Sequence, residues 1–109
     1  MKEVSAQEAF EKINSGEAIG MDVREAMEWQ AGRAGIENVA WNPLSGFDPQ
    51  KLPQDKPVIF ICRSGNRSGQ VTMQLENHGL DVANMVGGMQ AWEAAGLPMA
   101  ADNGSPYVA

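Results

Sequence analysis

The sequence predicts an α/β protein whose central parallel sheet is covered by helices on both faces. Expected strands and helices alternate along the chain with short connections, and repeated strand–helix units of this kind form parallel sheets. The most apolar segment, "KPVIFIC" at residues 56–62, is continuously apolar and rich in β-branched residues. Parallel strands that are buried on both faces have this composition.

The length and composition of the chain fit one domain. It has 109 residues, of which 43% are hydrophobic and 20% charged. A domain of this size buries roughly two-thirds of its unfolded surface, so it can sustain a core without disulfides or metals. We expect residues 1–100 to form this domain. Residues 101–109, "ADNGSPYVA", are rich in turn formers and are expected to form a loose or strapped C-terminal tail.

The N-terminal segment carries the signals of a helix followed by a strand. Ser5 followed by Glu8 matches a capping box, in which the serine oxygen accepts a hydrogen bond from a backbone N–H of the first turn. Apolar residues then recur at helical spacing, which predicts a helix over residues 5–16 that ends at a glycine. Residues 18–23, "AIGMDV", form a short apolar run with an acid near its end and indicate a buried strand.

The next segment predicts a helix, a strand and a short turn. Residues 24–32, "REAMEWQAG", are typical of a helix that places Met27 near Ala31 and stops at its final glycine. Residues 37–43, "ENVAWNP", indicate a strand that is stopped by its proline. A short helix or turn is expected over residues 44–52.

The most apolar strand leads into a helix. Residues 56–62 are expected to form this strand, and residues 68–80, "SGQVTMQLENHGL", the helix. The helical spacing makes Val71, Leu75 and Met73 its expected core-facing residues. A strand and a helix therefore flank the short polar loop between them.

The last part of the domain repeats the strand–helix pattern. Residues 81–88, "DVANMVGG", indicate a strand, and residues 89–96, "MQAWEAAG", a helix. The pair Gly87–Gly88 is expected to form a strand-to-helix turn rather than a phosphate site, because no lysine follows at P-loop spacing. We expect Trp92 to belong to the core.

The only cysteine of the chain lies where the strand over residues 56–62 meets the polar loop. Ligands of open α/β sheets bind beyond the carboxyl ends of the strands, and Cys62 falls at such an end. The loop "CRSGNRS" contains small residues that can turn successive backbone N–H groups toward one point, and Gly65 permits left-handed backbone. Arg63, Arg67 and the following helix N-terminus add positive charge. These features predict an anion-binding nest that favours the thiolate of Cys62.

Ionisation alone explains little of what such a loop can do. Lowering a thiol pKa from about 8.5 to about 6 raises the thiolate fraction at pH 7 roughly thirtyfold. The accompanying loss of intrinsic nucleophilicity is roughly tenfold, which leaves a net gain of about threefold. We therefore expect the loop to act mainly by holding an anionic substrate and by stabilising the group that forms on sulfur.

Two charged residues stand at the end of the strand over residues 18–23. Asp22 and Arg24 could line the mouth of a site beside the Cys62 loop. We favour a buried charge network that braces the loop, because buried acids are usually paired.

Three motifs, in this order, resemble the rhodanese (thiosulfate sulfurtransferase) family. The loop "CRSGNRS" is similar to the active-site loop of that family. The segment "MDVREAMEWQAGRAGIENVAWNP" looks like its "DVR…E…G-H-I-x-G-A…N-I-P" stretch, and "MVGGMQAWEAAGLPM" like its "L-x-G-G-x-x-x-W…G-x-P" ending. The resemblance spans residues 5–99 and implies a rhodanese-like fold with a central parallel sheet of about five strands. One position departs from the pattern, because Arg33 stands where the family usually has histidine.

The resemblance also implies a reaction and roles for the loop residues. Cys62 is expected to be the catalytic cysteine, which takes sulfane sulfur from a donor such as thiosulfate and passes the persulfide sulfur to a thiophilic acceptor. The backbone N–H groups of residues 63–67 would cradle the persulfide, and Arg63 or Arg67 would hold the anionic donor. Hydrogen bonds within the loop would tune it. The expected substrate-binding residues are Arg63, Ser64, Gly65, Asn66, Arg67 and Ser68.

The expected partners are a small anionic sulfur donor and a thiol or protein acceptor, with no cofactor. Cys62 and His78 are the only cysteine and histidine, so the usual structural zinc sites cannot be built and no metal is expected. The net charge of -6 opposes binding to nucleic acid. No apolar run approaches the ~20 residues of a membrane-spanning helix. We expect a cytoplasmic protein without a membrane partner, or a periplasmic one if a signal peptide has been removed.

Two other functions use a loop of this kind. Cysteine-dependent phosphatases and arsenate reductases resemble one another in a wider loop, with arginine one position further from the cysteine. Here four residues separate Cys62 from Arg67, and this shorter ring suits one sulfur atom better than a phosphoryl group. A non-enzymatic sulfur-carrier or interaction module would need the same persulfide, so the sequence leaves that alternative open.

Overall fold

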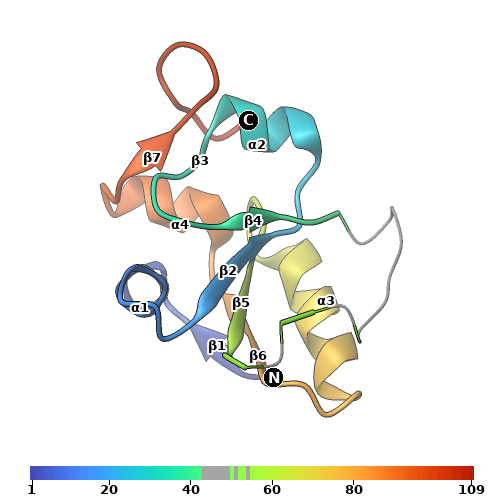
Figure 1. Cartoon of the computed structure of the whole chain (residues 1–109). Helices are drawn as coiled ribbons and strands as arrows, with labels where there is room; N and C mark the ends of the chain where they lie inside the picture. The colour runs from blue at the N-terminus through green and yellow to red at the C-terminus, as the bar shows by residue number, and fades with distance from the viewer. Residues whose placement is uncertain (43–49, 51, 54) are drawn as a thin grey trace.

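A computed structural model describes residues 1–42, 50, 52–53 and 55–109. Within these residues the strands and helices alternate around a five-stranded parallel sheet with the order β1-β6-β5-β2-β4 (Figure 1). The strands of this sheet are β1 (Glu3–Val4), β2 (Ile19–Asp22), β4 (Val39–Ala40), β5 (Val58–Ile61) and β6 (Val82–Met85). The helices are α1 (Ala6–Asn14), α2 (Ala26–Ala31), α3 (Asn66–Glu76) and α4 (Gly88–Ala94). The predicted fold class is confirmed.

Helices cover both faces of the sheet, as Figure 1 shows, with α1 and α4 on one side and α3 on the other. Successive side chains of a strand point to opposite faces. In the central strand β5, Ile59 and Ile61 therefore pack with α1 and α4, whereas Val58 and Phe60 pack with α3. All four side chains are at most 2% exposed. Burial on both faces explains why this strand is continuously apolar.

The helices begin and pack for reasons that are visible in the sequence. The Ser5 hydroxyl accepts a hydrogen bond from the backbone N–H of Glu8 at 3.1 Å, which caps α1 as expected. Val71 and Leu75 of α3 are buried against the sheet, as predicted. Trp92 of α4 is 0% exposed, which confirms its place in the core.

Some expectations on individual elements were wrong. Met73 of α3 is 55% exposed, because it lies on a helix face that points away from the sheet. Helix α3 begins at Asn66, two residues before the expected range, so part of the polar loop is helical. Within residues 37–42, the described part of the strand expected over residues 37–43, only β4 is a strand. The expected helix or turn over residues 44–52 falls mostly outside the described residues.

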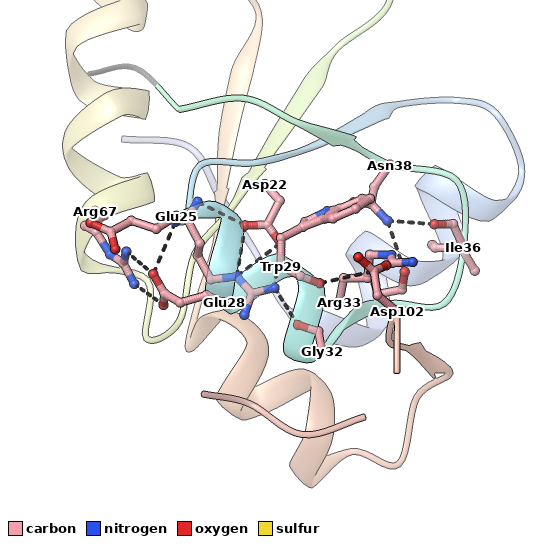
Figure 2. Close-up of polar contacts among 12 residues, drawn as sticks. Asp22, Glu25, Glu28, Trp29, Gly32, Arg33, Ile36, Asn38, Arg67 and Asp102 are labelled. Atoms are coloured by element: carbon pink, nitrogen blue, oxygen red, sulfur yellow. Dashed lines mark hydrogen bonds and ion pairs between the residues drawn. The ribbon is translucent and has the colours of Figure 1, made fainter. Parts of the chain in front are cut away.

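A second, small sheet was not predicted. It pairs β3 (Arg33–Ala34) with β7 (Met99–Ala100) in antiparallel orientation. Residues 101–109 continue from β7 along α2, where the backbone N–H of Asp102 donates to the carbonyl of Gln30 at 2.9 Å. The Arg33 guanidinium forms an ion pair with Asp102 at 2.8 Å and stacks on Trp29. These contacts hold residues 101–109 against α2 (Figure 2).

The chain connections that follow β2 and β5 lead to opposite edges of the sheet. The two strands are neighbours, with Asp22 opposite Ile61. From β5 the chain continues through α3 to β6 on one side, whereas from β2 it continues through α2 to β4 on the other. The loops that follow these strands therefore diverge, and ligands of open α/β sheets bind at such a switch point. Among the described residues, no helix has both the length and the apolar character needed to cross a membrane.

Candidate active site

Cys62 is the first residue after β5, at the carboxyl edge of the sheet. Its side chain is buried, with 0% of the residue exposed. The Cys62 carbonyl accepts a hydrogen bond from the backbone N–H of Met89 at 2.8 Å, and the Arg63 carbonyl accepts one from Gln90 at 3.0 Å. The first turn of α4 therefore fixes the backbone on which the sulfur is carried.

The close approach of α4 to the cysteine depends on Gly88. This residue has a φ of 57°, in the left-handed region that favours glycine. A Cβ at this position would lie 2.4 Å from the Cys62 carbonyl oxygen and 2.6 Å from the carbonyl carbon and oxygen of Arg63. The predicted turn at Gly87–Gly88 is confirmed, and the structure explains why its second residue is glycine.

The loop turns hydrogen-bond donors toward the cysteine sulfur. The backbone N–H of Gly65 donates to Cys62 Sγ at 3.0 Å, and the Ser68 hydroxyl lies 3.2 Å from the same atom. Gly65 has a φ of 98° and directly precedes the first residue of α3. The left-handed backbone of Gly65 thus lets the chain fold over the sulfur and start a helix whose N-terminal end lies beside it.

Burial and hydrogen bonding act in opposite directions on the Cys62 thiol. Burial raises its pKa, whereas hydrogen bonds from the Ser68 hydroxyl and from the backbone N–H groups of Ser68, Gly65 and Ser64 lower it. The hydrogen bonds outweigh burial, so the pKa of Cys62 lies below its ordinary value. A cysteine at a helix N-terminus among N–H groups is expected to ionise in this way.

A buried asparagine from the neighbouring strand completes the polar contacts of the loop. Asn84 lies in β6, is 3% exposed, and stands opposite Phe60 of β5. Its Nδ2 donates to the Gly65 carbonyl at 3.2 Å, and its Oδ1 lies 2.5 Å from the Ser68 hydroxyl oxygen. Asn84 therefore holds both Gly65 and Ser68, which contact Cys62 Sγ.

Arg67 is engaged by an acid from the other side of the switch point. Figure 2 shows its guanidinium facing the carboxylate of Glu28 on α2, and two hydrogen bonds of 2.8 Å join the groups. Hydrogen bonding to Arg67 lowers the pKa of Glu28 and, in turn, raises the pKa of Arg67. Paired bonds of this kind fix both planar groups. The Arg67 side chain thus ties α3 to α2.

Arg63 has a different environment from Arg67. It is exposed, and its Nε donates to the carbonyl oxygen of Ala109 at 3.0 Å. The segment of residues 101–109 therefore reaches from α2 to the first residue after the cysteine. Arg67 is thus held by two hydrogen bonds to a side-chain carboxylate, whereas Arg63 makes one hydrogen bond to a main-chain oxygen of Ala109.

Asp22 and Arg24 form a buried ion pair, as expected. Asp22 is 1% and Arg24 2% exposed, and Arg24 donates to the two Asp22 carboxylate oxygens at 2.8–3.1 Å. Arg24 Nη2 also donates to the Gly32 carbonyl at 2.7 Å. The pair fastens the end of β2 to the end of α2 (Figure 2), and α2 in turn carries Glu28.

The structure brings together only part of the set predicted from the sequence. Gly65 and Ser68 contact the Cys62 sulfur, and the backbone N–H of Ser64 also donates to it. The residues of the predicted set that are exposed are Arg63, Ser64, Asn66 and Arg67. Sequence reasoning missed Glu28 and Asn84 as parts of the site. One feature of the sequence could have indicated Asn84: it is a polar amide within a short strand that is otherwise apolar.

The fold and the loop define a class of α/β proteins that carry a cysteine loop at the switch point of a parallel sheet. The model of the family described as "Rhodanese-like domain" matches residues 5–95, so the chain belongs to the rhodanese-like family. The resemblance that the sequence motifs indicated is confirmed.

Relatives and solved structures agree with this assignment. "Putative sulfurtransferase YtwF" of Bacillus subtilis is 38% identical, over 90% of this chain and 96% of that protein. "Thiosulfate sulfurtransferase GlpE" of Actinobacillus succinogenes is 32% identical, over 89% of this chain and 88% of that protein. An uncharacterized protein of Synechocystis is also 32% identical over 93% of this chain, which spans 58% of its length.

Among solved structures, a rhodanese-related protein from Thermoplasma volcanium superimposes with a TM-score of 0.81. It is 27% identical, and the match covers 92% of this chain and 98% of that one. The family and the names of the relatives support a function of the sulfurtransferase type.

Proposed function

We propose that this protein is a sulfurtransferase that carries sulfane sulfur as a persulfide on Cys62. The observation that supports this most directly is the position of Cys62 Sγ, 3.0 Å from the Gly65 N–H and beside the first turn of α3. Donors that are oriented before the reaction stabilise charge that develops on or next to the sulfur. The name of the Actinobacillus succinogenes relative makes thiosulfate the first donor to test.

The proposed first step moves one sulfur atom. The Cys62 thiolate attacks the outer sulfur of thiosulfate, a new S–S bond forms on Cys62, and the S–S bond of thiosulfate breaks to release sulfite. The electron pair of the broken bond leaves with sulfite, and the outer sulfur keeps its negative charge as the persulfide anion. In the second step a thiophilic acceptor, such as a thiolate or cyanide, attacks this outer sulfur and regenerates the Cys62 thiolate. Neither step requires a general base when the attacking group is already ionised.

We assign the binding of the anionic donor to Arg63 rather than to Arg67. The Arg67 guanidinium is occupied by two 2.8 Å bonds to Glu28, so its charge is largely compensated. Arg63 makes one hydrogen bond, from its Nε to a main-chain oxygen of Ala109, and is exposed at the start of the loop. The Nη groups of Arg63 are therefore more available than those of Arg67 to a dianion that approaches the loop.

The engagement of Arg67 also weighs against a phosphatase-type reaction. Stabilising a transferring phosphoryl group requires a guanidinium that is free to contact its equatorial oxygens. Here the guanidinium is bonded to an acid on α2, and the ring from Cys62 to Arg67 has only four residues inside it. The geometry favours a single sulfur atom over a phosphoryl group.

Steady-state turnover separates these activities. The protein is expected to transfer sulfur from thiosulfate to cyanide, and Cys62→Ser is expected to lose this turnover. Hydrolysis of an aryl phosphate by the same preparation is expected to stay at the level of the Cys62→Ser variant. Cysteine-dependent phosphate hydrolysis without thiosulfate turnover would contradict the proposal.

A further inference from the structure

One hydroxyl group lies between two acceptors in the loop. The Ser68 hydroxyl oxygen is 3.2 Å from Cys62 Sγ and 2.5 Å from Asn84 Oδ1. All three residues are buried, with exposed fractions of 0% for Ser68 and Cys62 and 3% for Asn84. A hydroxyl carries a single proton, so it can donate to only one of the two acceptors at a time.

The remaining contact of Asn84 determines the direction of these hydrogen bonds. The Gly65 carbonyl can only accept, so the group of Asn84 that faces it at 3.2 Å must be the amide NH2. The other side of the amide, which faces Ser68, is therefore its carbonyl oxygen. Because this oxygen can only accept, the Ser68 hydroxyl donates to Asn84 and presents a lone pair to the sulfur.

We propose that Asn84 is a positioning residue of the Cys62 site, which competes with the thiolate for the hydroxyl proton of Ser68. When Cys62 is a thiol, its S–H donates to Ser68, Ser68 donates to Asn84, and each group has a partner. When Cys62 loses its proton, the Ser68 hydroxyl can turn to the sulfur only by leaving Asn84 Oδ1 without its donor. A buried acceptor without a donor is unfavourable.

This competition limits how strongly the loop stabilises the thiolate. The bond from Ser68 to the sulfur is gained at the expense of the bond from Ser68 to Asn84, so its net contribution is smaller than that of a hydroxyl without a second acceptor. A less stabilised thiolate is the better nucleophile, because intrinsic nucleophilicity falls as thiol acidity rises. Asn84 therefore moderates the acidity of Cys62 from the neighbouring strand. The inference concerns the proton of Cys62 and does not depend on which sulfur donor the protein uses.

The charged groups near the network lie on the loop, α2 and α3. On the loop and α3 they are Arg63, Arg67 and Glu76, and from α2 Glu28 is paired with Arg67. Residues 82–89, which form β6 and the start of α4, include no charged side chain. The pH dependence of Cys62 alkylation therefore reports the thiol itself.

The test is a double-mutant cycle on Ser68 and Asn84, read out as the pH profile of Cys62 alkylation by iodoacetamide. Asn84→Ala removes the competing acceptor and also releases the Gly65 carbonyl. In the Ser68→Ala background, Asn84→Ala reports the release of the Gly65 carbonyl alone. One hydrogen bond raises the thiolate fraction about fivefold, and the accompanying loss of nucleophilicity is about twofold. We therefore expect Asn84→Ala to raise the alkylation rate below the thiol pKa about two- to threefold more with Ser68 present than in the Ser68→Ala background.

Equal changes in the two backgrounds would overturn the proposal, because a merely structural Asn84 would act independently of Ser68. Circular dichroism establishes whether each variant is folded. If Asn84→Ala does not fold, Asn84→Asp replaces it in the cycle. A carboxylate holds the hydroxyl proton more firmly, so alkylation is expected to slow more with Ser68 present than in the Ser68→Ala background. An equal slowing in both would show only the effect of charge and would contradict the inference.

Discussion

The two glycines that border α4 allow the packing of the active-site loop to be tested with a matched pair of substitutions. Gly88 and Gly96 both have positive φ, 57° and 68°. An alanine at either position would have to adopt the left-handed backbone conformation, which costs about 1–2 kcal/mol. At Gly96 no heavy atom lies within 4 Å of the added Cβ. Gly96→Ala is therefore expected to lower the free energy of unfolding by this backbone cost alone, about 1–2 kcal/mol.

At Gly88 the added Cβ meets backbone. It would lie 2.4 Å from the Cys62 carbonyl oxygen, below the 3.0 Å that real Cβ contacts respect. The loop must move away, and overpacking of this kind costs a further ~1–3 kcal/mol. Movement of the Cys62 carbonyl also breaks its 2.8 Å bond with the Met89 N–H, worth about 1 kcal/mol. We therefore expect Gly88→Ala to lower the free energy of unfolding by about 3–6 kcal/mol.

The assay is denaturant unfolding of both variants, together with the rate of Cys62 alkylation in the folded state. Gly96→Ala is expected to keep the wild-type alkylation rate, because nothing near the sulfur changes. Gly88→Ala is expected to change that rate, because the carbonyl that orients Cys62 has moved. Equal losses of stability, or an unchanged alkylation rate in Gly88→Ala, would refute the packing derived for this turn.

Three further predictions concern charge and pH. Glu28→Gln is expected to cost about 1 kcal/mol of unfolding free energy at neutral pH, because Arg67 is partly exposed. The pKa of Glu28 is lowered in the fold, so this stabilisation is lost as the pH falls below 4.5. The pKa of Cys62 is also lowered, so wild type is expected to gain stability over Cys62→Ser as the pH rises toward 9.0. Arg63→Ala is expected to slow alkylation by iodoacetate severalfold relative to iodoacetamide, whereas Lys56→Ala is not.

Each of these predictions has a contrasting outcome. Glu8→Gln removes an exposed helical ion pair and is expected to change stability by less than about 0.5 kcal/mol. A loss as small for Glu28→Gln would show that its pair with Arg67 does not brace the loop. A stability difference between wild type and Cys62→Ser that is flat in pH would contradict the lowered thiol pKa. Equal reagent ratios in the Arg63→Ala and Lys56→Ala variants would remove Arg63 from donor binding.

The sheet and the location of the cysteine could be predicted from the sequence, because both follow from local pattern. The continuous apolar run of β5 requires burial on both faces, and the loop after it has to lie at the carboxyl edge of the sheet. The contact of Gly65 with the sulfur is local as well, since it spans three residues. The burial of β5, the location of the loop and the Gly65 contact are all determined by residues that are close together in the sequence.

The contacts that complete the site join distant parts of the chain, and the sequence alone does not show them. Glu28 and Arg67 are 39 residues apart, and Ser68 and Asn84 are 16 apart. Their meeting depends on the strand order and on the exact register of β6 against β5. Two arginines in one loop look equivalent in the sequence, and only the fold distinguishes the one that is paired with a carboxylate.

The most direct measurement is the intact mass of the protein after incubation with thiosulfate and removal of excess reagent. A sulfurtransferase that carries its cargo on Cys62 gains the mass of one sulfur atom, and subsequent cyanide removes it. Cys62→Ser, treated in the same way, is expected to keep its original mass. No added sulfur on wild type, or the same addition on Cys62→Ser, would contradict the proposed function.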